Sequence, residues 1–286
     1  MRRIALATSA AYSALTEDDR LLLGPLAERG LRAEPAVWKD LKYSWRNCDA
    51  VIIRSCWDYH LRLDEFLAWI DSLERAGVRV FNQPSLLRWN ADKIYLRDFE
   101  RKGVPIIPTF WGESGTPTDL AAQLRDLGWQ KAVIKPRISA SAHKTRLTSA
   151  QSAAHDQALF DELQCGPGVM LQKFMDEVQT AGEWSLMFFA GHFSHAVMKT
   201  PKPGDFRVQH EYGGFTVAQD PPAPVLDTAV RIMDTLDPTP LYARVDGVES
   251  NRHFLLMELE LIEPALFLDA TSDAPRLLAD AIAAAL

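Results

Sequence analysis

Two glutamates near the end of the chain have the spacing of metal ligands. Residues two apart share one face of a β-strand, so Glu258 and Glu260 are expected to point one way. The interleaved Met257, Leu259 and Leu261 are expected to point the other way. Like charges this close raise each other's pKa and destabilise a dry site unless a cation lies between them. Carboxylate oxygens without a nearby His or Cys are typical ligands of magnesium or manganese.

A third carboxylate lies about one hairpin upstream. Asp246 ends residues 241–246, which we interpret as the neighbouring antiparallel strand. Its side chain would supply a third oxygen ligand beside Glu258 and Glu260. The alternative is an edge strand whose glutamates face water. We favour the metal site because apolar residues flank the glutamates and a matching aspartate precedes them.

Composition excludes several classes of function. The chain has 286 residues, 47% of them hydrophobic, and a net charge of −7, which argues against a nucleic-acid-binding surface. The apolar run after Met1 is too short for a signal peptide or a membrane-spanning helix. The three cysteines form no C-x-x-C pair, so we expect reduced thiols in a cytoplasmic protein.

The elements that must position these residues begin with a β-α-β-β-α-β alternation. Its strands and helices are predicted at residues 1–8, 16–30, 33–38, 50–54, 63–77 and 78–81, with Thr16 as the N-cap of the first helix. This order is typical of a parallel sheet covered by helices. No G-x-G-x-x-G follows the first strand, which argues against nicotinamide or flavin chemistry. Arg54, just past a strand end, would either hold a substrate carboxylate or pair with Asp58.

A helical connector and a domain boundary near Val104 follow. Beyond it we predict strands and helices at residues 129–135, 152–163, 168–174, 184–189, 192–199, 221–236 and 273–286. The strands at 184–189 and 192–199 are expected to form a hairpin around Ala190 and Gly191. Two loops between these elements are candidates for ligand contact. Residues 137–143 are small and could bring backbone N–H groups near phosphate, although no glycine is present. Residues 200–214 form a long polar loop of the kind that usually carries function.

Taken in order, the polar residues of the chain resemble those of the ATP-grasp superfamily, which includes glutathione synthetase and D-alanine:D-alanine ligase. The motifs R-S-x-W-D-Y, E-W-S-L, K-T-P-x-P-G-D-F-R and E-L-E-L-I-E-P are most similar to the D-cycloserine-forming, glutathione synthetase-like (RimK-type) subgroup. The resemblance spans essentially the whole chain. It implies an α/β (α+β) fold: an N-terminal parallel-sheet domain (residues 1–103), then two subdomains (104–174 and 175–286) that hold ATP between them.

The resemblance also implies a nucleotide site. The residues that it assigns to ATP are Lys93, Lys135, Ser139, Ala140, Ser141, Gln172, Lys173, Phe174, Glu177 and Glu183. In this assignment Lys93 and Lys135 hold the α- and β-phosphates, and Gln172 with the following backbone holds adenine. Glu177 or Asp176 binds the ribose. Glu183 orders a lysine or binds the ribose, or it is an ordinary glutamate at a strand end.

The remaining site residues are assigned to chemistry and to the organic substrate. Arg207, followed by Gly213 and Gly214 in the same loop, steadies the transferring phosphoryl group. Arg54 and Tyr59 orient the other end of the substrate. Among the histidines, only His210 in the Arg207 loop merits a test.

The activity implied is that of an ATP-dependent carboxylate–amine ligase that forms an amide through an acyl phosphate. Two magnesium ions, replaceable by manganese, would be held by Asp246, Glu258 and Glu260. The substrate is an amino-acid-like small molecule. In the cycloserine-like case the amide closes a ring, and the enzyme takes part in antibiotic biosynthesis. The alternatives are a small-molecule kinase and a nucleotide-binding protein without turnover. The sequence leaves monomer and homodimer open.

Overall fold

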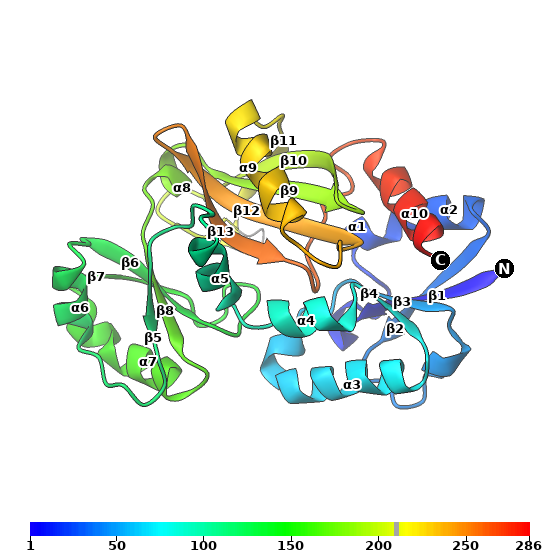
Figure 1. The fold of residues 1–286 in the computed structure, drawn as a ribbon, viewed down its shortest axis with the longest axis horizontal. Helices are drawn as coiled ribbons and strands as arrows, with labels where there is room; N and C mark the ends of the chain where they lie inside the picture. Colours follow the sequence, from blue (N-terminus) through cyan, green and yellow to red (C-terminus); the bar gives the residue numbers. More distant parts are fainter. Residues whose placement is uncertain (209–211) are drawn as a thin grey trace.

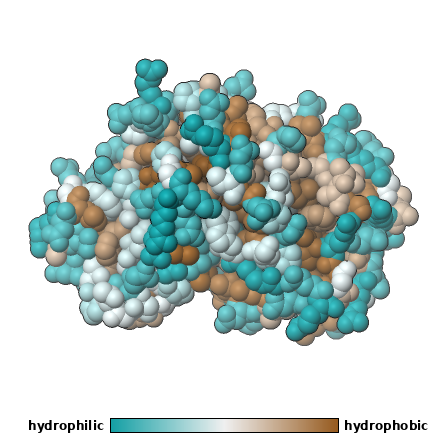
Figure 2. Space-filling view, in the orientation of Figure 1, coloured by the Kyte–Doolittle hydropathy of each residue, from teal (hydrophilic) through white to brown (hydrophobic). Residues whose placement is uncertain are grey.

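The computed structural model describes residues 1–208 and 212–286, and it contains three β-sheets with associated helices (Figure 1). The first sheet and both termini lie at one end of the molecule. The second sheet lies at the opposite end, and the third lies beside both (Figure 1). Hydrophilic side chains predominate along the outline of this face (Figure 2). Within the described ranges, no helix is long and apolar enough to cross a membrane.

The N-terminal sheet confirms the predicted alternation. Its strands are β1 (Arg2–Thr8), β2 (Leu31–Val37), β3 (Ala50–Ile53) and β4 (Arg79–Phe81). They are all parallel, in the order β2-β1-β3-β4. The predicted first helix is divided into α1 (Glu17–Arg20) and α2 (Leu23–Glu28), and α3 (Leu63–Arg75) packs on the sheet. The hydroxyl oxygen of Thr16 caps α1 by accepting a hydrogen bond from the Asp19 backbone, as the sequence predicted.

The second sheet is antiparallel and has a core of its own. Its strands are β5 (Thr109–Gly112), β6 (Lys131–Pro136), β7 (Arg146–Ser149) and β8 (Val169–Lys173), in the order β5-β8-β6-β7. Helices α6 (Leu120–Asp126) and α7 (Ala153–Cys165) pack on it through a cluster that includes Leu124, Ile134 and Phe160. Cys165, at the end of α7, is exposed, whereas Cys48 and Cys56 are buried. The loop between β6 and β7 is the predicted phosphate loop.

The third sheet carries the acidic residues. It comprises β9 (Glu183–Phe189), β10 (His192–Thr200), β11 (Phe215–Ala218), β12 (Tyr242–Ser250) and β13 (His253–Glu260), all antiparallel, in the order β11-β10-β9-β12-β13. Helix α9 (Ala223–Asp234) packs against it. The predicted hairpin at Ala190 and Gly191 is confirmed, with both residues at positive φ.

Connecting elements join the sheets. Besides α8 (Glu177–Thr180), they are α4 (Pro84–Asn90), α5 (Tyr95–Arg101), α10 (Ala274–Ala285) and the 3-10 helices η1 (Ala10–Tyr12), η2 (Trp45–Asn47) and η3 (Tyr59–Arg62). Helix α10 packs on the N-terminal sheet, since Leu278 shares a core with Ile4 and with Phe189 of the third sheet. The Asn82 side chain donates to the carbonyls of Tyr242 (2.8 Å) and Leu261 (2.7 Å). The first and third sheets therefore share a core, and the boundaries at 103 and 174 remain a proposal.

Candidate active site

One cavity of about 280 Å³ brings most of the predicted residues together. It lies where the second and third sheets and the loop after β3 meet. The predicted residues that line it are Tyr59, Lys93, Lys135, Ser139, Ala140, Ser141, Gln172, Lys173, Phe174, Glu183, Arg207, Asp246, Glu258 and Glu260.

The three carboxylates lie on paired strands, as predicted. Asp246 of β12 is the register partner of Glu258 of β13. A β-bulge follows, because Gly247 pairs with Leu256 and leaves Met257 as an extra residue. Met257 therefore lines the cavity on the same side as Glu258, which corrects the expectation that it faces away. The alternation fails at this point because the bulge shifts the side-chain phase by one residue.

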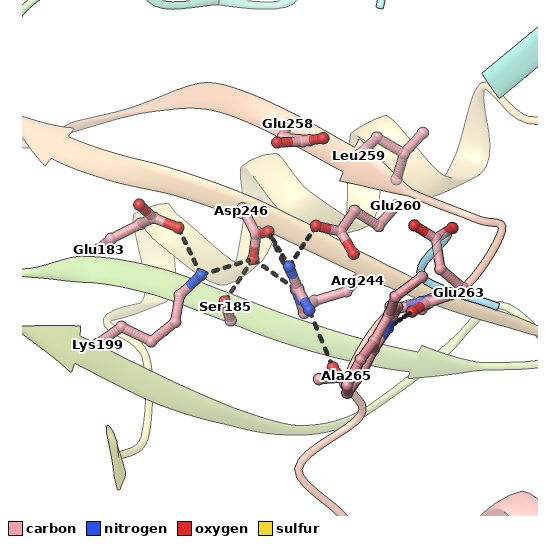
Figure 3. Close-up of polar contacts among 12 residues, drawn as sticks. Glu183, Ser185, Lys199, Arg244, Asp246, Glu258, Leu259, Glu260, Glu263 and Ala265 are labelled. Atoms are coloured by element: carbon pink, nitrogen blue, oxygen red, sulfur yellow. Dashed lines mark hydrogen bonds and ion pairs between the residues drawn. The ribbon is translucent and has the colours of Figure 1, made fainter. Parts of the chain in front are cut away.

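Protein cations lie between the carboxylates (Figure 3). The Arg244 guanidinium donates from Nη2 to Asp246 Oδ2 at 2.8 Å and also pairs with Glu260. Lys199 Nζ lies 2.5 Å from Glu183 Oε1 and 3.6 Å from Asp246 Oδ1. Burial alone would raise the pKa of Asp246, but Arg244 and Lys199 hold that pKa below its ordinary value. The pKa of Lys199 is raised, since Asp246 and Glu183 outweigh the opposing effect of burial.

The carboxylate oxygens of the cavity are suitable ligands for a hard divalent cation. Among the described residues, no three His, Cys, Asp or Glu side chains meet closely enough to hold a metal by themselves. Glu258 lies 3.1 Å from Lys93 Nζ and remains partly exposed to the cavity. Burial, then repulsion from Glu258 and Asp246 against attraction from Arg244, raises the pKa of Glu260 to about 7. The cluster therefore has more carboxylate than its own cations neutralise, and oxygen donors favour magnesium.

Two polar groups at the other side of the cavity fit ATP. Lys135 Nζ donates to Gln172 Oε1 at 2.7 Å, and no carboxylate of the residues described lies within ion-pair distance of it. Burial is the main cause of the lowered pKa of Lys135. Gln172 Nε2 is buried without a hydrogen-bond partner in the described part of the chain. An ammonium group without a counter-ion and an amide without an acceptor match a phosphate and a polar base.

The phosphate loop is held in place from two sides. Lys93 Nζ donates to the Ser139 carbonyl at 2.5 Å. Ser141 and Ala142 adopt positive φ of 49° and 52°, a region that glycine favours. The His143 ring lies 5.2 Å from that of His60 in the N-terminal unit. Burial, then the charges of His143 and Lys93, lowers the pKa of His60 to about 4. With Lys144 also at a positive φ of 52°, the glycine-free loop is left-handed at three residues, and it contacts η3.

Arg54 does not reach the cavity. Its Nε donates to Asp19 Oδ1 at 2.8 Å, and its Nη2 donates to the Pro264 carbonyl at 2.9 Å. Only 2% of Arg54 is exposed. The alternative partner Asp58 instead pairs with Lys39 at 2.8 Å. Both expectations for Arg54 are wrong, because the side chain turns into the core where β3 ends.

Other predicted residues lie beside the cavity or outside it. Glu177 accepts a hydrogen bond from Ser250, and neither it nor Asp176 lines the cavity. Gly213 and Gly214 also lie off the lining, although Arg207 of the same loop is on it. The residues just before them, including His210, fall outside the described ranges.

Arg207 itself is fixed within its loop. It donates from Nη2 to Asp205 Oδ2 at 2.9 Å and lies 3.7 Å above the Tyr212 ring centre. Gly214 supports this geometry, because a Cβ there would lie 2.1 Å from the Val208 carbonyl oxygen. The guanidinium is therefore paired but partly exposed at the edge of the cavity.

Sequence reasoning gave no role to several polar residues that line the cavity, among them Lys199, Arg244, Trp57 and Glu263. The signal for Arg244 was its position two residues before Asp246, on the same strand face. Glu263 is only 7% exposed and follows the acidic strand. Its pKa is raised well above the ordinary carboxyl value, first by burial and then by Glu260.

Comparisons with known proteins identify relatives of this chain. A family model described as D-cycloserine synthetase DcsG, N-terminal domain, matches residues 4–82. The cycloserine biosynthesis protein DcsG of Streptomyces lavendulae is 31% identical over 297 residues, covering 98% of this chain and 97% of that protein. The crystal structure of D-cycloserine synthetase DcsG superposes with a TM-score of 0.88 at 28% identity, covering 99% of both chains.

A more distant structure shares the fold alone. The ATP-grasp ligase PsnB, complexed with a minimal precursor, Mg and ADP, has a TM-score of 0.63 at 16% identity. The match covers 98% of this chain and 97% of that one. Its complex contains a nucleotide and a magnesium ion on this fold.

Proposed function

The chain belongs to the D-cycloserine synthetase family of ATP-grasp ligases, and from that premise we propose that it joins a carboxylate to an amine through an acyl phosphate. It is an ATP-dependent ligase. The observation that carries the proposal is Lys135, a lysine inside the cavity whose hydrogen-bond partner is neutral. An ATP phosphate would supply its counter-ion, within the same cavity as the acidic cluster.

The nucleotide would lie between the second and third sheets. Lys93 and Lys135 would hold its phosphates beneath Ser139, Ala140 and Ser141. Gln172 and the backbone of Lys173 and Phe174 would contact adenine. Asp246, Glu258 and Glu260 would hold two magnesium ions, which manganese could replace. Magnesium would neutralise negative charge on the phosphate oxygens.

The chemistry has two steps. A substrate carboxylate oxygen attacks the γ-phosphorus in line, so that a C–O–P linkage forms and the bond to the β-phosphate oxygen breaks, releasing ADP. A nitrogen of the substrate then attacks the acyl carbon. The bond to phosphate breaks, and the nitrogen's proton leaves with the phosphate. Arg207 at the cavity edge would hold the transferring group while the surrounding loops exclude water.

The substrate is an amino-acid-like small molecule, and ring closure within one molecule is the form we favour. D-Cycloserine is a serine-derived ring in which the carboxyl carbon is bonded to a nitrogen on the side-chain oxygen. The relative 31% identical over 297 residues is named for its biosynthesis. O-Amino-D-serine, the open-chain form of that ring, is therefore the first substrate to test. The reduced cysteines favour a cytoplasmic enzyme.

The deciding experiment follows oxygen-18 from the substrate carboxylate. O-Amino-D-serine labelled with oxygen-18 in its carboxylate is incubated with ATP, magnesium and the full chain. Mass spectrometry then measures the oxygen-18 content of the released phosphate and of the organic product. The acyl-phosphate route requires one labelled oxygen in phosphate. Phosphate retained on the organic product would instead identify a kinase, and label confined to an organic amide would exclude an acyl phosphate.

A further inference from the structure

We propose that Glu263 is a specificity-determining residue that binds the free α-ammonium group of an amino-acid substrate. The proposal rests on the proposed function, because it assumes that the substrate carboxylate reacts in the same cavity. Glu263 lies in the segment after β13, and its side chain lines the cavity together with Trp57 and Tyr59 of the N-terminal unit.

The segment that carries Glu263 is fixed by the N-terminal unit. Trp57 Nε1 donates to the Glu263 carbonyl at 2.9 Å. Arg54 Nη2 donates to the next carbonyl, that of Pro264, at 2.9 Å. Asp19 in turn holds Arg54 by an ion pair of 2.8 Å. Arg54 is therefore a positioning residue. Together with Trp57, it fixes the backbone of the segment that carries Glu263 against the N-terminal unit.

The other acidic side chains of the cavity have cationic partners. Asp246 and Glu260 pair with Arg244, Glu258 with Lys93, and Glu183 with Lys199. Glu263 is only 7% exposed as a residue and lines the cavity, and in residues 1–208 and 212–286 its carboxylate has neither an ion-pair nor a side-chain hydrogen-bond partner. Figure 3 shows it beside Glu260, without a dashed contact to its carboxylate.

A ligand cation would complete this group. An ionised carboxylate that is buried without a partner is strongly unfavourable, and an ammonium group offers three hydrogen-bond donors. Trp57 and Tyr59 line the same cavity, and aromatic side chains attract cations. Magnesium is the less suitable occupant of this position. The carboxylates of Asp246 and Glu258 lie opposite each other on paired strands, and Glu258 lies beside Lys93, which we assign to the phosphates.

The test compares Glu263→Gln with two substrates that differ by one group. O-Amino-D-serine carries the α-ammonium, and 3-(aminooxy)propanoate lacks it but retains the reacting carboxylate and nitrogen. Loss of one member of a buried charge pair predicts a KM for O-amino-D-serine that is about 100-fold higher in the variant. The KM for 3-(aminooxy)propanoate, the KM for ATP and the magnesium dependence should change less than about threefold. Glu263→Asp should recover part of the loss.

Controls separate this proposal from the proposed function. Glu100→Gln makes the same chemical change on an exposed helix residue and should leave every constant unchanged. An equal effect of Glu263→Gln on both substrates would overturn the proposal, because a general base or a metal ligand acts on both. Failure of the wild type to form ADP would overturn the proposed function instead.

A binding measurement tests the role of Glu263 independently of catalytic activity. Calorimetry measures the affinity of D-cycloserine against isoxazolidin-3-one, which is the same ring without the amino group. The wild type should prefer D-cycloserine, and Glu263→Gln should abolish that preference. A wild type without the preference, or a variant that keeps it, overturns the proposal whatever the outcome of the ATP assay.

Discussion

Lys135 illustrates how a single side chain can indicate a ligand. Its ammonium group contacts the neutral amide of Gln172 at 2.7 Å, while Lys93 and Lys199 each have a carboxylate partner. Burial disfavours the charged form of Lys135 and lowers its pKa. A polyanion bound beside it would restore the ordinary value, so this residue couples protonation to nucleotide binding.

Replacing Lys135 with Ala should therefore affect ATP more than the organic substrate. Loss of a charge-assisted contact to phosphate predicts a KM for ATP that is about 10- to 100-fold higher. The KM for the organic substrate should change little. Steady-state kinetics with each substrate varied in turn measures both constants, and Lys102→Ala on the exposed surface is the control. A raised constant for the organic substrate alone would place Lys135 outside the nucleotide site.

Asp18 makes a testable contribution to stability. Its Oδ2 is buried without a hydrogen-bond partner among the described residues, and burial is the main cause that raises its pKa to about 6. An acid whose folded pKa exceeds its unfolded value binds the proton more tightly when folded. Its contribution to stability is therefore greatest at low pH and is lost as pH rises from about 4 to about 6.

Asp18→Asn should consequently stabilise the protein at pH 7.5. The amide keeps an acceptor for the Leu268 backbone N–H and removes the buried charge. The expected gain in unfolding free energy is about 1–3 kcal/mol at pH 7.5 and smaller at pH 5. Urea denaturation at both pH values measures it, with the exposed Asp234→Asn as control. A gain of equal size at both pH values would show that the charge is not its cause.

Among the elements, the loop between β10 and β11 depends most on one glycine. A Cβ on Gly214 would lie 2.1 Å from the Val208 carbonyl oxygen, so even alanine cannot fit without moving the segment that begins at Arg207. Gly214→Ala should lower kcat at least about tenfold and also lower the melting temperature, because the displaced Val208 belongs to a small buried cluster.

Gly24 of α2 provides the matched control, since a Cβ there meets nothing within 4 Å. Gly24→Ala should leave kcat unchanged, because α2 lies away from the cavity. Activity and thermal melting of the two variants are compared in parallel. An active Gly214→Ala enzyme would show that the loop geometry is not needed for catalysis.

The sequence predicted most elements because their apolar periods are strong and short turns bound them. The β-α-β-β-α-β order, the hairpin at Ala190 and the paired strands of Asp246 and Glu258 were all confirmed. The bulge was missed, although Gly247 is the signal for it. A Cβ on Gly247 would lie 2.4 Å from the Leu255 carbonyl oxygen, and a glycine inside a strand often marks such a close approach.

Prediction of the site was limited by side-chain direction and by register between distant strands. Lys199 reaches Asp246 because β10 and β12 both flank β9, a relation that sequence spacing does not contain. Arg54 was placed at the correct strand end, but its side chain turns inward to Asp19. The identity of a residue and the end of its strand are thus predictable, whereas the partner it faces depends on the tertiary fold.

For the whole molecule, the distribution of cores predicts how it opens. The N-terminal sheet, α10 and part of the third sheet share one cluster, which includes Ile4, Phe189 and Leu278. The second sheet has a separate cluster around Leu124 and Phe160. We therefore expect the second sheet to open independently of the other two.

Hydrogen exchange measured by mass spectrometry tests this expectation. Without nucleotide, amides of β6 and β8 should exchange at least about tenfold faster than those of β1 and β9. ATP with magnesium should slow the exchange of β6 and β8 most. Exchange at one common rate in all three sheets would mean that the molecule opens as a single cooperative unit.

The distribution of cysteines gives the molecule a natural attachment point for a fluorophore. Cys165 is exposed at the end of α7, on the second sheet's lobe, while Cys48 and Cys56 are buried. Burial also raises the pKa of Cys56, which leaves its thiol poorly reactive. A maleimide dye would thus label the native chain at one position. Its emission would test in real time whether that lobe moves when nucleotide binds, without any engineered residue.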